Sequence, residues 1–132
     1  HNYLSEQING NPDTSKYNEF YKIFLIDEDC FNVKGDVYGQ AKDRNTKEVI
    51  VFRKGLNDNT CVHELFHALG LRHPFDKLNK YIFKKFTTDN VMDYSDVGPL
   101  QIPVIATWRY QWEYLHKVLR TIEDKNNKTK KQ

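Results

Sequence analysis

The sequence has 132 residues, of which 39% are hydrophobic, 14% aromatic and 29% charged. This length suits one domain with a core of its own, and a net charge of +2 argues against a dedicated nucleic-acid-binding protein. No run approaches the roughly 18 apolar residues of a membrane span, and no secretory signal is recognisable. Because the first residue is His rather than Met, we expect a piece of a longer chain.

The first half of the chain contains three strand-like runs. "EFYKIFLID" (19–27) and "VIVF" (49–52) are rich in aromatic and β-branched residues, so both predict buried strands. "VKGDVYGQA" (33–41) carries two glycines inside a strand pattern. Glycine at such positions indicates a bulge or a close approach by another backbone, which predicts an edge strand.

A helix is predicted after the turn-forming stretch "GLNDN" (55–59). Asp58 or Asn59 is the expected N-cap, and the helix should end at about Leu69. One face of this helix is apolar and is expected to pack against the sheet; it consists of Val62, Leu65, Phe66 and Leu69.

The C-terminal region predicts a second helix, from Thr107 to about Asp124. Apolar side chains recur there at spacings of four and three residues and form one stripe: Trp108, Trp112, Leu115, Leu119 and Ile122. Residues 125–132 are polar and basic and are predicted to be a disordered tail. The expected organisation is therefore a single domain over residues 1–124, followed by this tail.

The segment "CVHELFHALGLRHPF" (61–75) holds three of the five histidines of the chain. On a helix His63 and His67 lie one turn apart on one face, which lets two imidazoles reach one zinc ion. Glu64 lies ~100° further round, beside such a metal, where it can take a proton from water. This spacing predicts a metal site with an adjacent base.

His73 can join the same site only if the helix ends before it. In a continued helix it would lie ~15 Å along the axis from His63. Gly70 stands where a left-handed residue would turn the chain back, and Pro74 prevents the helix from resuming. We therefore predict that all three histidines bind one Zn²⁺ ion and leave one coordination position open, which is typical of catalytic rather than structural zinc.

"HELFHALGLRH" (63–73) matches H-E-x-x-H-x-x-G-x-x-H at every fixed position, and in this the chain resembles the metzincin metallopeptidases. The single methionine, Met92, follows His73 by 19 residues in "DNVMDYS", similar to the methionine turn of that clan. The resemblance implies that His63, His67 and His73 are zinc ligands, that Glu64 is the general base, and that Met92 forms a hydrophobic floor. Tyr94 resembles the tyrosine of astacin-like and serralysin-like members, which approaches the zinc.

The resemblance also implies a fold and an activity. The fold is α+β: a small mixed sheet with backing and active-site helices, and a lower lobe with the methionine turn and the C-terminal helix. The activity is that of a zinc metalloendopeptidase, with the peptide lying extended along an edge strand at Gly35–Ala41. The region ahead of the active-site helix is short for this clan, so a first strand or part of the backing helix is expected to be missing or replaced.

Partners and location follow from more specific likenesses. The stretches "LGLRHPF" and "NVMDYS" are similar to pappalysin-type members, and "DYSDVGPLQIPVIATWRYQW" is similar to short metzincin modules of large bacterial secreted effectors and toxins. This implies a protein or peptide substrate, an inhibitor or immunity protein as a further partner, and secretion or delivery as part of a larger chain.

Two other classes of function stay open on the sequence. In a gluzincin-like peptidase the third ligand would be a downstream glutamate, such as Glu113 or Glu123, in place of His73. Alternatively, the chain is a zinc-stabilised binding or effector module without catalytic activity, although such a module has no use for Glu64 beside the metal.

Overall fold

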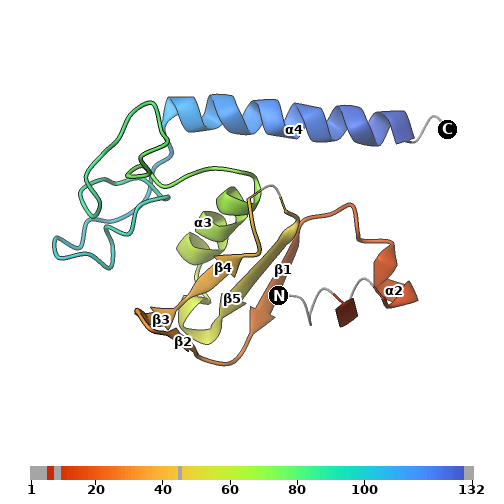
Figure 1. Ribbon diagram of the computed structural model, residues 1–132, viewed down its shortest axis with the longest axis horizontal. Coiled ribbons are helices and arrows are strands. Elements are labelled where there is room, and N and C mark those ends of the chain that lie inside the picture. The colour runs from red at the N-terminus through yellow and green to blue at the C-terminus, as the bar shows by residue number, and fades with distance from the viewer. Residues whose placement is uncertain (1–5, 8–9, 45, 130–132) are drawn as a thin grey trace. The chain divides into compact units, whose positions relative to one another are not determined.

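The computed structural model describes residues 6–7, 10–44 and 46–129. The chain divides into two compact units, residues 1–70 and 71–132. Its fold is α+β, as predicted, with a small mixed sheet and two longer helices (Figure 1). The assignment of residues 1–124 to one domain stays a prediction. Among the described residues, no helix has both the length and the apolar character that crossing a membrane requires.

The first unit is built on a three-stranded sheet in the order β1-β5-β4. The central strand β5 (Glu48–Phe52) pairs in parallel with β1 (Lys22–Ile26) and antiparallel with β4 (Gly39–Ala41). Strands are therefore confirmed within 19–27 and 49–52, but only β5 is buried as predicted. β1 lies at an edge of the sheet, and its Ile23 and Leu25 are 40% and 62% exposed. Two short helices flank the sheet in the sequence: α2 (Pro12–Ser15) and the 3₁₀ helix η1 (Arg53–Gly55).

The single strand predicted at 33–41 is wrong, because the chain breaks at Tyr38 into two short strands. Strand β3 (Gly35–Val37) pairs antiparallel with β2 (Cys30–Asn32) in a separate two-stranded sheet. Only β4 belongs to the main sheet, where it is an edge strand. The predicted edge is thus present, but it covers the last third of the predicted run.

Helix α3 (Asp58–Ala68) begins at a different cap from the predicted one. Asn57 is the N-cap: its backbone is extended, with φ −144°, and its side chain accepts a hydrogen bond from the N–H of Thr60 at 2.8 Å. Asp58 and Asn59 already lie inside the helix, where a side chain cannot fold back on the first orphan N–H groups. The expectation that either residue caps the helix was therefore wrong by one or two positions.

Helix α3 packs against β4 and β5 (Figure 1). The core of this unit consists of Val49, Val51 and Ala68, against which Tyr21, Ala41 and Cys61 pack. Cys61 and Ala68 are seven residues apart and share one helix face. The packed face is thus rotated from the predicted one, and Val62, which was expected to face the sheet, is 37% exposed. Both cysteines are unbridged.

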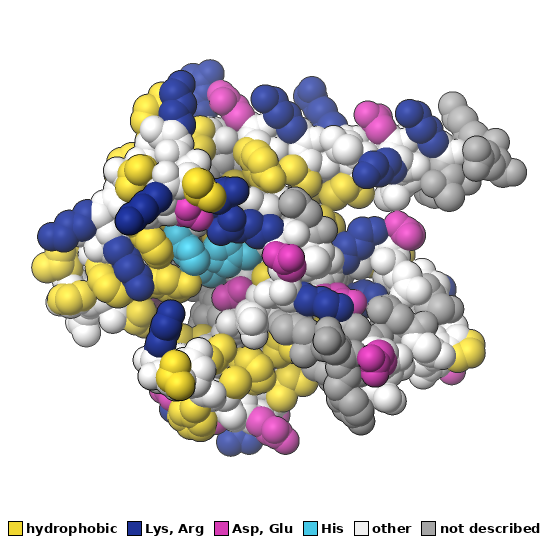
Figure 2. Space-filling view, viewed as in Figure 1, with side chains coloured by type: hydrophobic (Ala, Val, Ile, Leu, Met, Phe, Trp, Pro, Cys, Tyr) yellow, Lys and Arg dark blue, Asp and Glu magenta, His cyan; other side chains and the backbone are white. Residues whose placement is uncertain are grey.

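The second unit consists of an irregular segment followed by helix α4 (Arg109–Thr129). The helix begins two residues later than predicted and ends five residues later, so part of the predicted tail is helical; residues 130–132 lie outside the described residues. Leu115 in the predicted apolar stripe is buried, whereas Trp112 and Leu119 are almost half exposed. Figure 2 shows hydrophobic side chains along one side of this helix.

Candidate metal centre

Helix α3 brings two histidines together, as its periodicity predicts. His63 and His67 are four residues apart, and their Nε2 atoms lie 3.1 Å from each other. His63 is buried, with 6% of its surface exposed, and His67 is half-buried. Without a metal, a hydrogen bond between one protonated and one unprotonated ring nitrogen suits this distance. Two nitrogens bound to one tetrahedral zinc ion at roughly 2.1 Å would lie a similar distance apart.

The chain leaves the helix at Gly70 in the predicted way. Gly70 has φ +99°, in the region that favours glycine. Its N–H donates to the carbonyl of His67 at 2.9 Å, and the N–H of Leu69 donates to that of Leu65. These bonds satisfy carbonyls that the end of a helix would otherwise leave unpaired. The predicted left-handed turn is confirmed.

The three histidines of the motif form a group that could hold a metal ion. One ring nitrogen each from His63, His67 and His73 lies within 4.8 Å of the other two. Three neutral imidazoles are the donor set of many catalytic zinc sites, in which the fourth position is taken by water or substrate. The donor set therefore fits the predicted metal.

Glu64 lies on the same helix as the first two histidines and is largely buried. Its carboxylate accepts a hydrogen bond from the backbone N–H of Ala41 in edge strand β4, at 2.8 Å. Burial raises the pKa of Glu64 to about 7, although the Ala41 bond acts in the opposite direction. A carboxyl group with such a pKa can both accept and release a proton near neutral pH.

Gly39 allows strand β4 to approach helix α3 at this point. A Cβ atom at Gly39 would lie 2.8 Å from Cγ of Glu64 and 3.0 Å from Cγ2 of Thr60. Both distances are shorter than ordinary carbon contacts. A close approach is therefore present at position 39, but its nearest atoms belong to side chains of helix α3, one of them the candidate base, rather than to another backbone as predicted.

His73 lies in an aromatic cluster within the second unit. Its Nε2 is 2.7 Å from the hydroxyl of Tyr94, and the two ring centroids are 4.9 Å apart. The ring of Phe75 also stacks on this imidazole, with centroids 4.7 Å apart and planes 10° from parallel. Tyr94, which sequence reasoning singled out, is thus in direct contact with a candidate ligand.

The methionine turn is held together by a carboxylate that the sequence did not reveal. Asp93 is 2% exposed and accepts hydrogen bonds from the N–H groups of Phe86, Thr88 and Tyr94 and from the hydroxyls of Thr88 and Ser95, at 2.8–3.2 Å. Burial alone would raise the pKa of Asp93, but these bonds together bring it below its usual value. Asp93 therefore acts as a buried anionic anchor.

A pair of side-chain amides joins this turn to helix α4. Asn90 and Gln111 exchange two hydrogen bonds, at 2.8 and 3.0 Å, and both are fully buried. The amide oxygen of Asn90 also accepts the N–H of Met92, and that of Gln111 accepts the N–H of Trp108. Met92 itself is fully buried. Its part in forming a floor to the site stays a prediction.

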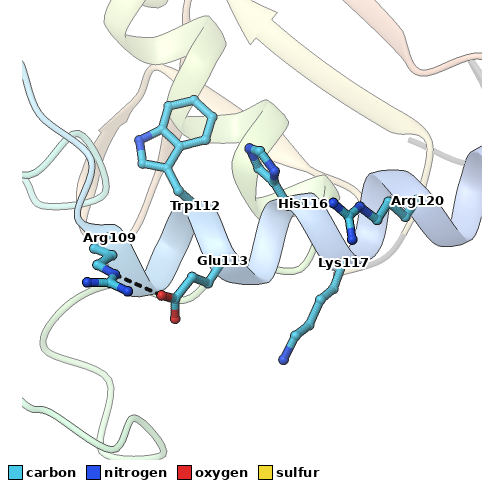
Figure 3. Close-up of a pocket in the computed structure, with 6 residues that line it drawn as sticks. All are labelled: Arg109, Trp112, Glu113, His116, Lys117 and Arg120. Carbon is cyan, nitrogen blue, oxygen red and sulfur yellow. Dashed lines mark hydrogen bonds and ion pairs between the residues drawn. The ribbon is translucent and has the colours of Figure 1, made fainter.

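The other sequence-based candidates do not join the histidine group. Among the described residues, this group contains no glutamate. Glu113 instead pairs with Arg109 at 2.9 Å on the exposed surface of α4. Figure 3 shows both in a pocket lined by α4 side chains, together with His116 but none of the three histidines of the motif. This pocket adds nothing to the candidate metal centre.

Comparisons with known proteins give limited support for the same class. The chain is 31% identical over 99 residues to a protein of Schizosaccharomyces pombe named as an endoplasmic reticulum metallopeptidase. The match covers 65% of this chain and 12% of that protein, so the chain spans about an eighth of its relative. No family model matches the sequence, and no solved structure matches it.

Proposed function

We propose that this chain is a zinc-dependent endopeptidase of the metzincin clan. The observation that carries the proposal is the convergence of His63, His67 and His73 beside the buried carboxyl group of Glu64. The partial similarity to a protein named as a metallopeptidase supports the reaction class. The H-E-x-x-H-x-x-G-x-x-H pattern supports the clan.

In this proposal the three histidines hold the zinc ion. A bound zinc ion supplies Lewis-acid chemistry, which polarises a peptide carbonyl and acidifies water. Glu64 takes a proton from the attacking water and passes it to the leaving amine, a role to which a pKa of about 7 is suited. The N–H of Ala41 keeps that carboxylate oriented between transfers.

Tyr94 and Met92 have supporting roles. The Tyr94 hydroxyl, 2.7 Å from Nε2 of His73, is placed to donate a hydrogen bond to negative charge that develops on the substrate oxygen. Met92 is proposed to form an apolar floor to the site, as the resemblance to metzincins implies. The substrate peptide adds to the exposed edge of β4, which narrows the predicted substrate strand from Gly35–Ala41 to Gly39–Ala41.

The biological setting is a separate part of the proposal. A module that spans an eighth of its relative is proposed to act as part of a larger chain that is secreted or delivered to its target. Its partners would be a protein or peptide substrate and an inhibitor or immunity protein that restrains it. The name of the relative refers to the endoplasmic reticulum and lends no support to a bacterial effector.

The test is a zinc titration combined with a peptide-library digest, with and without a chelator. We expect one Zn²⁺ per chain and cleavage that the chelator abolishes. Glu64→Gln should keep the metal and lower turnover by at least about a hundredfold. His73→Ala should lose zinc affinity, whereas Glu113→Ala should keep it. Retained zinc in His73→Ala together with loss in Glu113→Ala would favour the gluzincin-like alternative.

A further inference from the structure

The ammonium group of Lys85 lies in a cage of aromatic rings beside the candidate metal centre. Its Nζ is 4.5 Å from the ring centroid of Phe86, 4.8 Å from that of Tyr94 and 5.3 Å from that of Phe75. All three lie within the range of a cation–π contact. Phe75 and Tyr94 both contact the imidazole of His73. A positive charge thus lies next to two aromatic rings that themselves contact the candidate zinc ligand His73, and all of these residues belong to the second unit.

The backbone next to this lysine is held in an unusual conformation. Phe86 has φ +66°, in the left-handed region that bulky side chains rarely adopt, at a cost of roughly 1–3 kcal/mol. The N–H of Phe86 donates to Asp93 at 3.0 Å, which is one of the bonds of the buried anchor. The cage around Lys85 is therefore stabilised by the same carboxylate that supports Tyr94.

The ammonium group of Lys85 can still donate hydrogen bonds while it lies among the three rings. Aromatic rings attract an ammonium group but leave its three N–H donors available to a stronger acceptor. The side chain is exposed, and no ion pair joins it to a carboxylate among the described residues. By contrast, the only acid in residues 71–86, Asp76, pairs with Arg72 at 3.5 Å. That stretch holds five Lys and Arg residues in all, so it favours an anionic partner.

We propose that Lys85 binds a carboxylate of the substrate and gives the site a preference for acidic peptides. The carboxylate is either that of an acidic side chain near the scissile bond or that of a free C-terminus. Three rings hold the ammonium group in place, so little side-chain entropy is lost when the ion pair forms. This inference rests on the proposed peptidase function.

The experiment uses matched peptides and two lysine variants of the zinc-loaded protein. A peptide cleaved in the library digest is made with Glu or with Gln at each position flanking the scissile bond, and with a free or an amidated C-terminus. We measure kcat/KM for the wild type, for Lys85→Met and for the neighbouring control Lys84→Met. Binding of the same peptides to the Glu64→Gln variant, with and without Lys85→Met, is measured in parallel.

We expect the wild type to prefer one carboxylate peptide over its amide by about fivefold. Lys85→Met should abolish that preference while changing kcat/KM for the amide by less than about twofold, and Lys84→Met should keep the preference. A purely structural role for Lys85 would lower kcat/KM for both peptides equally, which would overturn the proposal. Cleavage without any carboxylate preference would also overturn it and leave the peptidase function intact. If the library yields no cleaved peptide, the binding measurement is made with Glu and Gln versions of an uncleaved library peptide. A Lys85-dependent preference for the Glu version would then support the carboxylate site while the peptidase function fails, and no preference would overturn the carboxylate site as well.

Discussion

Two buried carboxyl groups show how differently the two units of this protein position their polar side chains. Glu64, on helix α3, accepts one hydrogen bond among the described residues, and burial raises its pKa to about 7. Asp93, in the irregular segment, accepts five, and its pKa is lowered despite burial. Burial with few donors leaves a group that can exchange a proton, whereas burial with many donors leaves a permanent anion.

The same contrast holds for the backbone around each group. Helix α3 is held in place by repeated main-chain hydrogen bonds and by apolar contacts with the sheet. Its position therefore depends on many side chains, each of which contributes a small part of the stability. The segment before α4 has no strand of its own apart from the bridge of Asn90 with Ala106. Its shape depends on a few buried polar side chains, each with specific partners. Single substitutions should therefore be far more costly in the second unit.

The largest effect is expected from removing the anchor of the second unit. Asp93→Ala leaves five donors without their acceptor, and we expect the free energy of unfolding to fall by about 4 kcal/mol. Urea unfolding measures this directly. The matched control is Asp89→Ala, four residues away and exposed, which should change stability by less than about 0.5 kcal/mol. Equal losses in both variants would contradict the role assigned to Asp93.

The next effect is a pH dependence of opposite sign for the two carboxyl groups in metal-free protein. The pKa of Glu64 in the folded state, about 7, exceeds its ordinary value of 4.5, so the folded protein holds this proton more tightly than the unfolded chain. Stability should therefore fall by about 3 kcal/mol as the pH rises from 4.5 to 7. The lowered pKa of Asp93 gives a contribution that is present above pH 3.8 and is lost as the pH falls through its folded value.

Unfolding of the wild type and of Glu64→Gln across this pH range, with a chelator present, isolates the first contribution. The two proteins differ only in the carboxyl group of residue 64, so the difference between the two curves reports its contribution. Curves that run parallel from pH 4.5 to 7 would show that its pKa is not raised.

A smaller effect is expected at the amide pair that joins the turn to α4. Gln111→Ala leaves the buried amide NH₂ group of Asn90 and the N–H of Trp108 without their acceptor, at a cost of about 2 kcal/mol. A double-mutant cycle with Asn90→Ala should give a coupling energy above about 0.5 kcal/mol, because the two residues exchange their bonds. Glu113→Ala, two residues further along α4 on the exposed surface, is the control and should be close to neutral.

The smallest effect tests the start of helix α3. Asn57→Ala removes the bond to the N–H of Thr60 and should cost about 1 kcal/mol. Asn59→Ala, at a position that the sequence suggested as a cap, lies inside the helix and should be neutral or slightly stabilising, because alanine is the better helix former. Thermal unfolding of the two variants side by side distinguishes them. The reverse order of stability would show that Asn59 caps the helix, as the sequence predicted.

The parts of the fold and site that could be predicted are those governed by a short period or by a single residue type. The four-residue spacing of His63 and His67 sets their common helix face, and Gly70 supplies the positive φ that ends the helix. Strand β5 followed from its β-branched run, and Tyr94 from its place after the methionine.

The rest depends on contacts between residues far apart in the chain. Nothing local distinguishes Asp93 from Asp89 or Asp96, because its role depends on donors that converge only after the segment has folded. From its sequence position alone, Gln111 is expected to be an ordinary solvent-facing polar residue of a helix, yet the structure buries it fully. The β2–β3 hairpin did carry a signal, since Gly35 follows "NVK" between two strand-like runs.

The bonds of Gln111 bear on the order in which the protein matures. During synthesis, His63, His67 and His73 are all added to the chain before Gln111. Until that glutamine arrives, Asn90 lacks the partner that closes the turn between His73 and α4. A nascent or prematurely terminated polypeptide would therefore carry two of the three imidazoles on a formed helix while the surroundings of the third remain unfinished. The candidate metal centre would therefore be completed only after the C-terminal helix has been made.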